Sequence, residues 1–159
     1  MLKKQGSRLI ADESTLLISL PKRTFLVKRD VKSLVEFVSY EIAVKVKYLE
    51  VHFISAKKLH SINKKFLNHD YETDIITFQY SRSKKNIEGE ILISIDNAKE
   101  NAEKYLVSFS EELLRLVVHG ILHLAGYDDK SPEEKKKMMS KQEKLLNRFT
   151  MTIEKESLK

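Results

Sequence analysis

The segment His119–Asp129 (HGILHLAGYDD) places two imidazoles and one carboxylate at a spacing that can hold a metal ion. On an α-helix, at roughly 100° per residue, His119 and His123 project about 40° apart, with side chains roughly 5–6 Å from each other. Gly126 ends such a helix and lets the chain turn back, so that Asp129 can supply an oxygen ligand to the same ion. Three protein ligands leave a fourth position open, as in zinc sites that do chemistry.

Asp128 and His69 are the alternatives for the third ligand. Adjacent residues in a turn point in different directions, so Asp128 better suits orientation of a ligand or closure of the turn, and His69 lies in a more remote loop. A lone histidine on an apolar helix is more often a core residue with a hydrogen-bond partner. Here the paired histidines, the glycine and the carboxylate occur together, which predicts a metal site of His119, His123 and Asp129.

The spacing H-x3-H-x5-D is of zincin type. Zincin peptidases carry glutamate directly after the first histidine, as the general base for water attack, and this chain has Gly120 there. A peptidase of that mechanism is therefore not expected. The remaining chemistry is a zinc-bound water whose pKa the metal lowers toward neutrality, acting as a nucleophile or an activator. The residues identify no general base.

Hydrophobic periodicity predicts the elements that position this site. The segment from Leu113 to Leu124 is apolar around most of its circumference, so this helix, starting at Ser110, is expected to be central and buried. The other helices are expected at about 30–44, 56–67, 96–106 and 132–149, and the strands at about 16–20, 46–55, 73–80 and 89–94. Alternation along 46–55 fits a half-buried strand only with a phase slip near Leu49.

Composition and length limit the class of protein. The length of 159 residues predicts a single domain, residues 1–159, in which 151–159 form a frayed tail. The absence of cysteine excludes disulfides, Cys-ligated zinc and a thiol nucleophile. No apolar run approaches the ~20 residues of a membrane span, and no secretory signal is evident, so we expect a soluble cytoplasmic protein without membrane partners. The net charge of +6 modestly favours a polyanionic partner such as RNA.

Three segments together resemble the YbeY family, the rRNA maturation endoribonucleases. HGILHLAGYDD looks like the family signature HGxLHLxGYDH, and LHSINKKFLNHDYETDIITF resembles its LNxxFRxxDxPTDVLSF segment. GEILIS is similar to its GDIxIS strand. The segments occur in the family order and spacing, and the resemblance covers about residues 46–149.

The resemblance implies an α+β fold with a small mixed sheet of about four strands, packed with about five helices that include a zincin-like metal helix. It implies one zinc ion per chain and endonucleolytic cleavage of single-stranded RNA. The implied role is maturation of the 3′ end of small-subunit (16S) rRNA and late-stage ribosome quality control in the cytoplasm. The implied partners are single-stranded rRNA and the small ribosomal subunit, with a ribosomal protein or GTPase as a further candidate.

Two positions depart from the family pattern. The third ligand is Asp129 instead of histidine; carboxylate oxygen binds zinc at ~2.0–2.2 Å, so we expect zinc binding to survive with an altered pH optimum. The family arginine that could stabilise charge at the scissile phosphate corresponds to Leu67, which cannot do so. Lys64, Lys65 and Arg82 are candidates for RNA contact, although each could instead be a solvated surface residue and lysine lacks the bidentate geometry of arginine.

Two other functions stay open on the sequence alone. One is a non-catalytic ribosome-associated zinc protein, in which loss of the arginine at Leu67 has abolished turnover. The other is a metal-dependent hydrolase, including a peptidase, that acts on another substrate. RNA cleavage and its loss in His119→Ala would support the nuclease over both.

Overall fold

The computed structural model describes residues 14–20, 26 and 28–157. Four strands and five helices are formed within this part of the chain. In chain order they are β1 (Thr15–Ser19), α2 (Lys28–Glu41), β2 (Lys45–Ile54), α3 (Ala56–Leu67), β3 (Ile75–Gln79), β4 (Asn86–Ser94), α4 (Ile95–Tyr105), α5 (Phe109–Leu124) and α6 (Pro132–Ser157).

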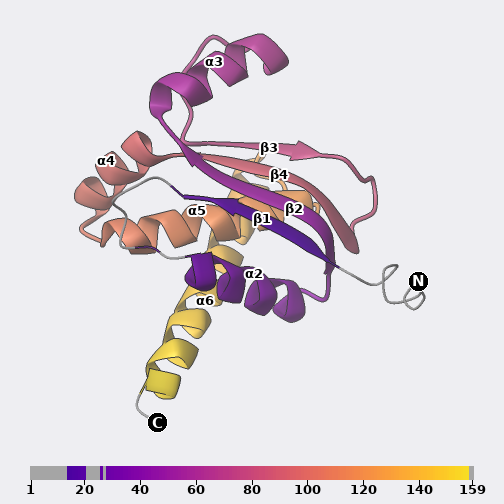
Figure 1. Cartoon of the computed structure of the whole chain (residues 1–159), viewed down its shortest axis with the longest axis vertical. Helices are drawn as coiled ribbons and strands as arrows, with labels where there is room; N and C mark the ends of the chain where they lie inside the picture. The colour runs from indigo at the N-terminus through magenta and orange to yellow at the C-terminus, as the bar shows by residue number, and fades with distance from the viewer. Residues whose placement is uncertain (1–13, 21–25, 27, 158–159) are drawn as a thin grey trace.

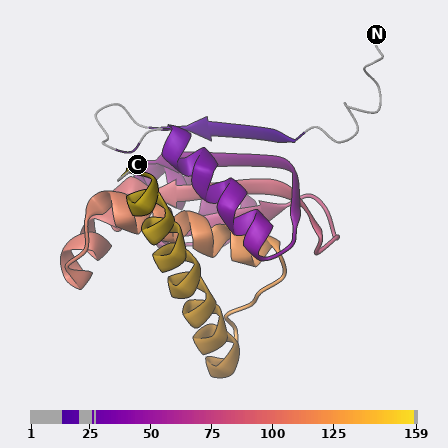
Figure 2. The ribbon, with the colours of Figure 1, turned by 90° about the horizontal axis from the view of Figure 1, so that it is seen from below.

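The strands form one sheet in the order β1-β2-β4-β3. β1, β2 and β4 are parallel, and β3 pairs antiparallel with β4, so the sheet is mixed. Helices α2, α5 and α6 lie on one side of the sheet, and α3 lies on the other (Figure 1, Figure 2). The predicted α+β fold, with a small mixed sheet of four strands and five helices, is confirmed.

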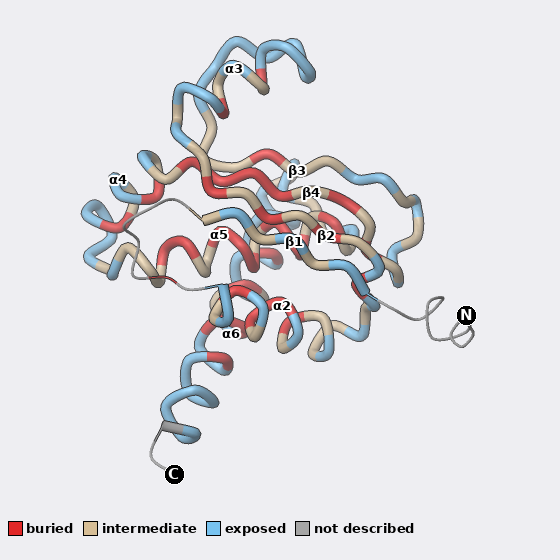
Figure 3. Tube along the Cα trace, in the orientation of Figure 1, coloured by how far each residue is buried: buried red, intermediate tan, exposed pale blue. Residues whose placement is uncertain are grey.

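Helix α5 lies at the centre of the core, between the sheet and helices α2 and α6. Its side chains Leu113, Val117 and Ile121 are fully buried, and so is Leu122. The prediction that this helix is central and buried, made from its apolar circumference, is therefore confirmed. Figure 3 shows the buried residues gathered along α5 and along the two central strands, β2 and β4. The helix that carries both site histidines is thus fixed by packing on several sides.

Serine hydroxyls start α4 and α5 two residues earlier than expected. Ser94 and Ser108 are the N-caps, each with an extended backbone and a side chain that accepts a backbone N–H. Asp96 and Ser110, the expected first residues of these helices, lie inside the first turns instead. Asp96 accepts a hydrogen bond from the backbone N–H of Ala56 at 2.7 Å, which ties α4 to the start of α3.

The phase slip expected in β2 is present, nearer the start of the strand than Leu49. The pairing of β2 with β4 shifts register between Val46 and Tyr48. After the shift, the buried positions of β2 are Leu49, Val51 and Phe53. The alternate residues, among them Glu50 and His52, face the opposite side of the sheet from α5 because side chains alternate along a strand.

Helix α6 is longer than the sequence predicts. Ser131 caps it by accepting the backbone N–H of Glu134 at 3.1 Å. The helix starts where expected but continues to Ser157 instead of ending near Phe149. Phe149 is the last buried residue, and residues 151–156 are exposed. Fraying of the tail stays a prediction. None of the helices in the described residues is long and apolar enough to cross a membrane.

Candidate metal centre

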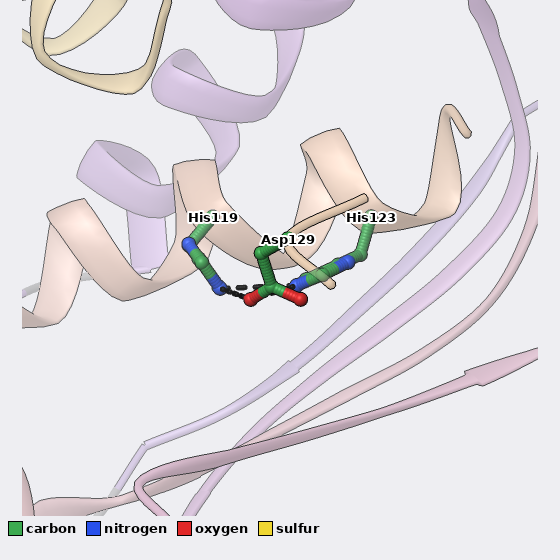
Figure 4. Close-up of side chains that lie close together, drawn as sticks. All are labelled: His119, His123 and Asp129. Atoms are coloured by element: carbon green, nitrogen blue, oxygen red, sulfur yellow. Dashed lines mark hydrogen bonds and ion pairs between the residues drawn. The ribbon is translucent and has the colours of Figure 1, made fainter. Parts of the chain in front are cut away.

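His119, His123 and Asp129 converge on one point, from α5 and from the turn that follows it (Figure 4). The Nε2 atoms of the two histidines are 3.1 Å apart. Oδ2 of Asp129 lies 3.8 Å from His119 Nε2 and 3.4 Å from His123 Nε2. The imidazole rings stand nearly perpendicular, at 79°. The predicted grouping of these three side chains is confirmed.

These separations suit the donor set of a tetrahedral zinc ion. Zinc–nitrogen and zinc–oxygen bonds of roughly 2.0–2.1 Å at tetrahedral angles place neighbouring ligand atoms about 3.3 Å apart. The three measured distances, 3.1, 3.4 and 3.8 Å, bracket that value. Two imidazole nitrogens and one carboxylate oxygen are also the ligand types that zinc accepts. The residues therefore fit the ion that the sequence implies.

A tight helix end brings Asp129 back toward the histidines. α5 ends at Leu124, and Gly126 adopts a positive φ of 100°, a conformation that favours glycine. The backbone N–H of Gly126 donates to His123 at 3.0 Å, and that of Tyr127 donates to Leu122 at 3.0 Å, which satisfies carbonyls at the helix end. The predicted role of Gly126 in ending the helix is confirmed.

Gln142 of α6 orients the imidazole of His119. Its Oε1 lies 2.7 Å from His119 Nδ1, and the residue is only 6% exposed. The amide nitrogen of Gln142 donates to Glu143 at 3.1 Å, which fixes the amide so that its oxygen faces the histidine. His119 therefore carries its proton on Nδ1 and turns the lone pair of Nε2 toward His123 and Asp129.

Arg115 anchors this arrangement by joining α5 to α6. Its guanidinium donates to both carboxylate oxygens of Glu143, at 2.9 and 3.1 Å. It also donates to Glu111 and Glu112, each at 2.9 Å. Since three carboxylates share one guanidinium, the positive charge of Arg115 is compensated within the protein.

Asn101 of α4 extends the same network to the other side of the site. Its amide donates to Glu112 at 3.3 Å and to Asp74 at 3.2 Å. Glu112 is 4% exposed, so its carboxylate needs these partners. Hydrogen bonds thus connect Asp74, ahead of β3, through α4, α5 and α6 to His119.

A cleft of 530 Å³ opens beside the donor group and is bordered by α4, α5 and α6. His119 and Asp129 line it, whereas the apolar part of its wall comes from residues such as Leu116 and Met138. Its charged lining residues are Asp74, Glu112, Asp129, Glu143, Arg115 and Lys135. The cleft is therefore rich in carboxylates and gives a solvent path to His119 and Asp129.

The surroundings of His119 favour the neutral imidazole. Burial lowers the pKa of His119, and the neighbouring His123 acts in the same direction. The hydrogen bond to Gln142 and the charges of Asp129 and Asp74 oppose that shift, but the pKa stays below its usual value. Neutral imidazole is the form that binds a metal ion.

Comparison with known proteins identifies the family. A family model described as endoribonuclease YbeY matches residues 17–150. The endoribonuclease YbeY of Chlorobium phaeovibrioides is 36% identical over 132 residues, 83% of this chain and 88% of the relative. That of Chlorobium phaeobacteroides is 50% identical over 93 residues, 58% of this chain and 65%, just under two thirds, of the relative. The chain belongs to the YbeY endoribonuclease family.

A solved structure of the same shape supports this membership. The solution structure of TM1509 from Thermotoga maritima is 30% identical and has a TM-score of 0.64. The match covers 89% of this chain and 93% of that one. The family expected from the three motifs is thus confirmed, and with it the enzyme class, because YbeY endoribonucleases are hydrolases that act on RNA.

Asp128 and His69, the alternative third ligands, lie outside the group. Asp128 accepts the backbone N–H of Asp129 at 2.8 Å, which fits closure of the turn, one of the two roles expected for it. His69 stacks on Tyr71 with ring centroids 5.1 Å apart. Of the three candidates for the third ligand, Asp129 is the one whose carboxylate lies near both histidines.

The candidate RNA contacts Lys64, Lys65 and Arg82 are exposed and do not line the metal cleft. Lys64 lies 3.9 Å from Asp70, and Lys65 lies over the ring of Phe66 at 5.4 Å. Their RNA contact stays a prediction. Leu67, where the motif resemblance implies an arginine in the family, ends α3 and is 37% exposed.

Sequence reasoning missed Gln142, Arg115 and Glu112. Their positions relative to the site depend on how α6 packs against α5, which no short motif encodes. The sequence gives one weak indication: Arg115 and Glu112 are charged residues on an otherwise apolar helix. Burying a charged side chain without a partner is unfavourable, so both residues are expected to be paired.

Gly120 stands directly after the first site histidine, where a zincin carries its glutamate, and little space is left for a side chain there. A Cβ atom at position 120 would lie 2.8 Å from side-chain atoms of Ile91 in β4. A side chain here would therefore enter the core between α5 and the sheet. The expectation against a zincin-type peptidase stays a prediction.

Proposed function

We propose that this protein is a zinc-dependent endoribonuclease that cleaves single-stranded RNA. The observation that carries the proposal is the convergence of His119, His123 and Asp129 at separations that suit one tetrahedral ion. The open cleft beside them gives a substrate access to that point. Membership of the YbeY endoribonuclease family supports RNA as the substrate, and the three-donor group at this cleft supports one zinc ion at the cleft.

The residues of the site divide the work between binding and orientation. His119, His123 and Asp129 would hold the ion, which when bound polarises a phosphate oxygen and lowers the pKa of water. Gln142 keeps the His119 imidazole in the tautomer that leaves Nε2 free to bind. Arg115 maintains Glu143 and hence Gln142 in place, and its compensated charge makes it a structural cation, not a phosphate ligand.

The biological reaction that we propose is maturation of the 3′ end of small-subunit (16S) rRNA, together with late-stage ribosome quality control. The three YbeY-like segments support this role, since the family resemblance implies it. The partners would be single-stranded rRNA and the small ribosomal subunit, with a ribosomal protein or GTPase as a further partner, in the cytoplasm.

Cleavage of RNA by zinc-loaded protein tests the proposal. The substrates are single-stranded RNA fragments from the 3′ end of small-subunit rRNA, and the variant is His119→Ala. The matched control is His60→Ala, because His60 is a half-exposed histidine paired with Asp70 and lies outside the donor group. We expect cleavage by the wild type and by His60→Ala, and none by His119→Ala.

Each other outcome contradicts the proposal. Cleavage that persists in His119→Ala would reveal a contaminating nuclease. Zinc and RNA binding without cleavage would favour a non-catalytic ribosome-associated protein. Hydrolysis of casein that depends on His119 would favour a peptidase.

RNA affinity measured against salt concentration tests the proposed contacts. Neutralising Lys64, Lys65 or Arg82 should weaken binding for all sequences and reduce the slope of log K against log salt by roughly 0.7 per lost phosphate contact. Lys155→Ala, at the exposed end of α6, is the control that should leave the slope unchanged. An unchanged slope in the other three variants would remove them from the interface.

A further inference from the structure

A second group of metal-ligating side chains lies on the face of the sheet that turns away from α5. Glu50 and His52 come from β2, and Glu90 comes from the adjacent strand β4. One ligand atom of each lies within 4.8 Å of the others, and all three residues are partly buried. This group shares no residue with the His119 site.

The β2–β4 register places the two carboxylates directly opposite each other. Glu50 pairs with Glu90 in the parallel ladder. Like charges at opposed positions of neighbouring strands repel, so a proton or a cation between them would relieve the repulsion. His52 Nε2 lies 2.8 Å from Glu50 Oε2 and so brings an imidazole nitrogen to the same point.

Two tyrosines hold the carboxylates in position. Tyr48 donates its hydroxyl proton to Glu50, and Tyr80 donates to Glu90. Groups that bond a carboxylate from behind orient it toward a metal ion and are a regular part of metal sites. The two carboxyl groups differ in pKa because their surroundings differ. Burial and the neighbouring Glu50 raise the pKa of Glu90, whereas hydrogen bonds from His52 and Tyr48 lower the pKa of Glu50.

The group opens into a hollow of 480 Å³ that gives solvent access. His52 and Glu90 line this hollow, together with Lys58 and Phe66 of α3. α3 packs on this face through Leu59 and its neighbours and lies over one end of the sheet (Figure 1). The side chains of His52 and Glu50 keep 28% and 20% exposure, so an ion can reach them from solvent.

We propose that Glu50, His52 and Glu90 form a second divalent-cation site, separate from the His119 site and of the class that binds Zn²⁺ or Mn²⁺. One imidazole nitrogen and two carboxylate oxygens are donors that both ions accept. The bound cation offsets the repulsion between the two glutamates and links β2 to β4 on the outer face of the sheet. It therefore stabilises the folded chain whenever it is bound.

Metal binding with the first site disabled tests this proposal. The double variant His119→Ala/His123→Ala, stripped with EDTA, is titrated with Zn²⁺ by calorimetry, and its melting temperature is measured with and without the ion. We expect one equivalent of Zn²⁺ to bind and the melting temperature to rise. Adding His52→Asn or Glu90→Gln should weaken that binding at least tenfold and remove the rise.

His60→Asn in the same background is the matched control. His60 also pairs with a carboxylate, Asp70 at 2.9 Å, but belongs to no three-donor group among residues 14–20, 26 and 28–157. Binding should be unchanged in this control. No zinc binding by the double variant, or binding that His52→Asn leaves intact, would overturn the proposal.

A second measurement leaves all residues of the sheet unchanged, so it can still test the proposal if the His52→Asn variant fails to fold. Mn²⁺ added to the His119→Ala/His123→Ala protein should broaden the imidazole NMR signals of His52 more strongly than those of His60 and His69. Equal broadening of all three, or none, would contradict a site at His52. Both readouts are independent of RNA cleavage, so failure here leaves the proposed nuclease function untouched.

Discussion

Replacing Gln142 by leucine should weaken zinc binding although Gln142 is not a proposed ligand. Leucine has a similar size but cannot accept the hydrogen bond from His119 Nδ1. In the wild type this nitrogen lies 2.7 Å from the amide oxygen of Gln142. Gln142 is 6% exposed, so little water could replace the lost acceptor. The imidazole would lose both its orientation and the preference for the tautomer with a free Nε2.

The magnitude follows from the cost of that missing hydrogen bond. A partly buried N–H left without an acceptor costs about 1–3 kcal/mol, and loss of the group that orients a metal-binding histidine typically reduces affinity ~10–100-fold. At about 1.4 kcal/mol per factor of ten, the two values agree. Gln142→Glu keeps an acceptor at the same place, so its zinc affinity should lie closer to that of the wild type.

Competition with a chelating dye measures the affinities, and Asn147→Leu is the control because Asn147 is exposed on the same helix. ¹⁵N chemical shifts of the His119 ring report the tautomer, which should change from Nδ1–H to a mixture in Gln142→Leu. Zinc affinity within twofold of the wild type in a folded Gln142→Leu protein would refute the reasoning. So would an unchanged tautomer.

Three further changes test the site and its support. Asp129→Ala should reduce zinc affinity by more than the ~10–100-fold expected for Gln142→Leu, whereas Asp128→Ala should leave the metal content of the purified protein unchanged. Gly120→Ala should lower the free energy of unfolding, measured in urea, by about 1–3 kcal/mol, because the added Cβ meets Ile91 at 2.8 Å. An unchanged free energy of unfolding would show that Ile91 and β4 can move to make room for the Cβ. Burial opposes the shift, but hydrogen bonds from Arg115 and Gln142 hold the pKa of Glu143 below its usual 4.5. The carboxylate therefore stabilises the fold above that pH and less as the pH falls through its lowered pKa, so the melting temperatures of wild type and Glu143→Gln should converge on acidification; a gap independent of pH would contradict this.

Local sequence was sufficient for the metal-binding helix and its turn. The i, i+4 histidines, the glycine that needs a positive φ and the following aspartate lie within one short segment, so their geometry depends on helix and turn conformation alone. The same holds for α3, whose predicted and observed bounds coincide at Ala56–Leu67. Errors of two residues arose where two serines compete as caps, as at Ser108 and Ser110, because the choice depends on backbone conformation before the helix.

Contacts between segments that are distant in sequence could not be predicted from local sequence patterns. The opposition of Glu50 and Glu90 requires β2 and β4 to be neighbours in a particular register, although β3 lies between them in sequence. The bulge between Val46 and Tyr48 decides which residues of β2 face outward, and a shift by one residue would have buried Glu50. The hydrophobic pattern of β2 indicates a phase slip, but its position between Val46 and Tyr48 depends on the pairing with β4.

The charge of the cleft shows what the tertiary arrangement adds to the proposed chemistry. Among the charged residues of its wall, four carboxylates (Asp74, Glu112, Asp129, Glu143) face two cations (Arg115, Lys135), a formal balance of −2. An RNA phosphate would be repelled by this wall, although the chain as a whole carries +6. A divalent ion on the histidines would cancel that balance. Attraction of RNA to the cleft should therefore depend on the bound ion, while exposed lysines outside the cleft supply the attraction that is independent of it.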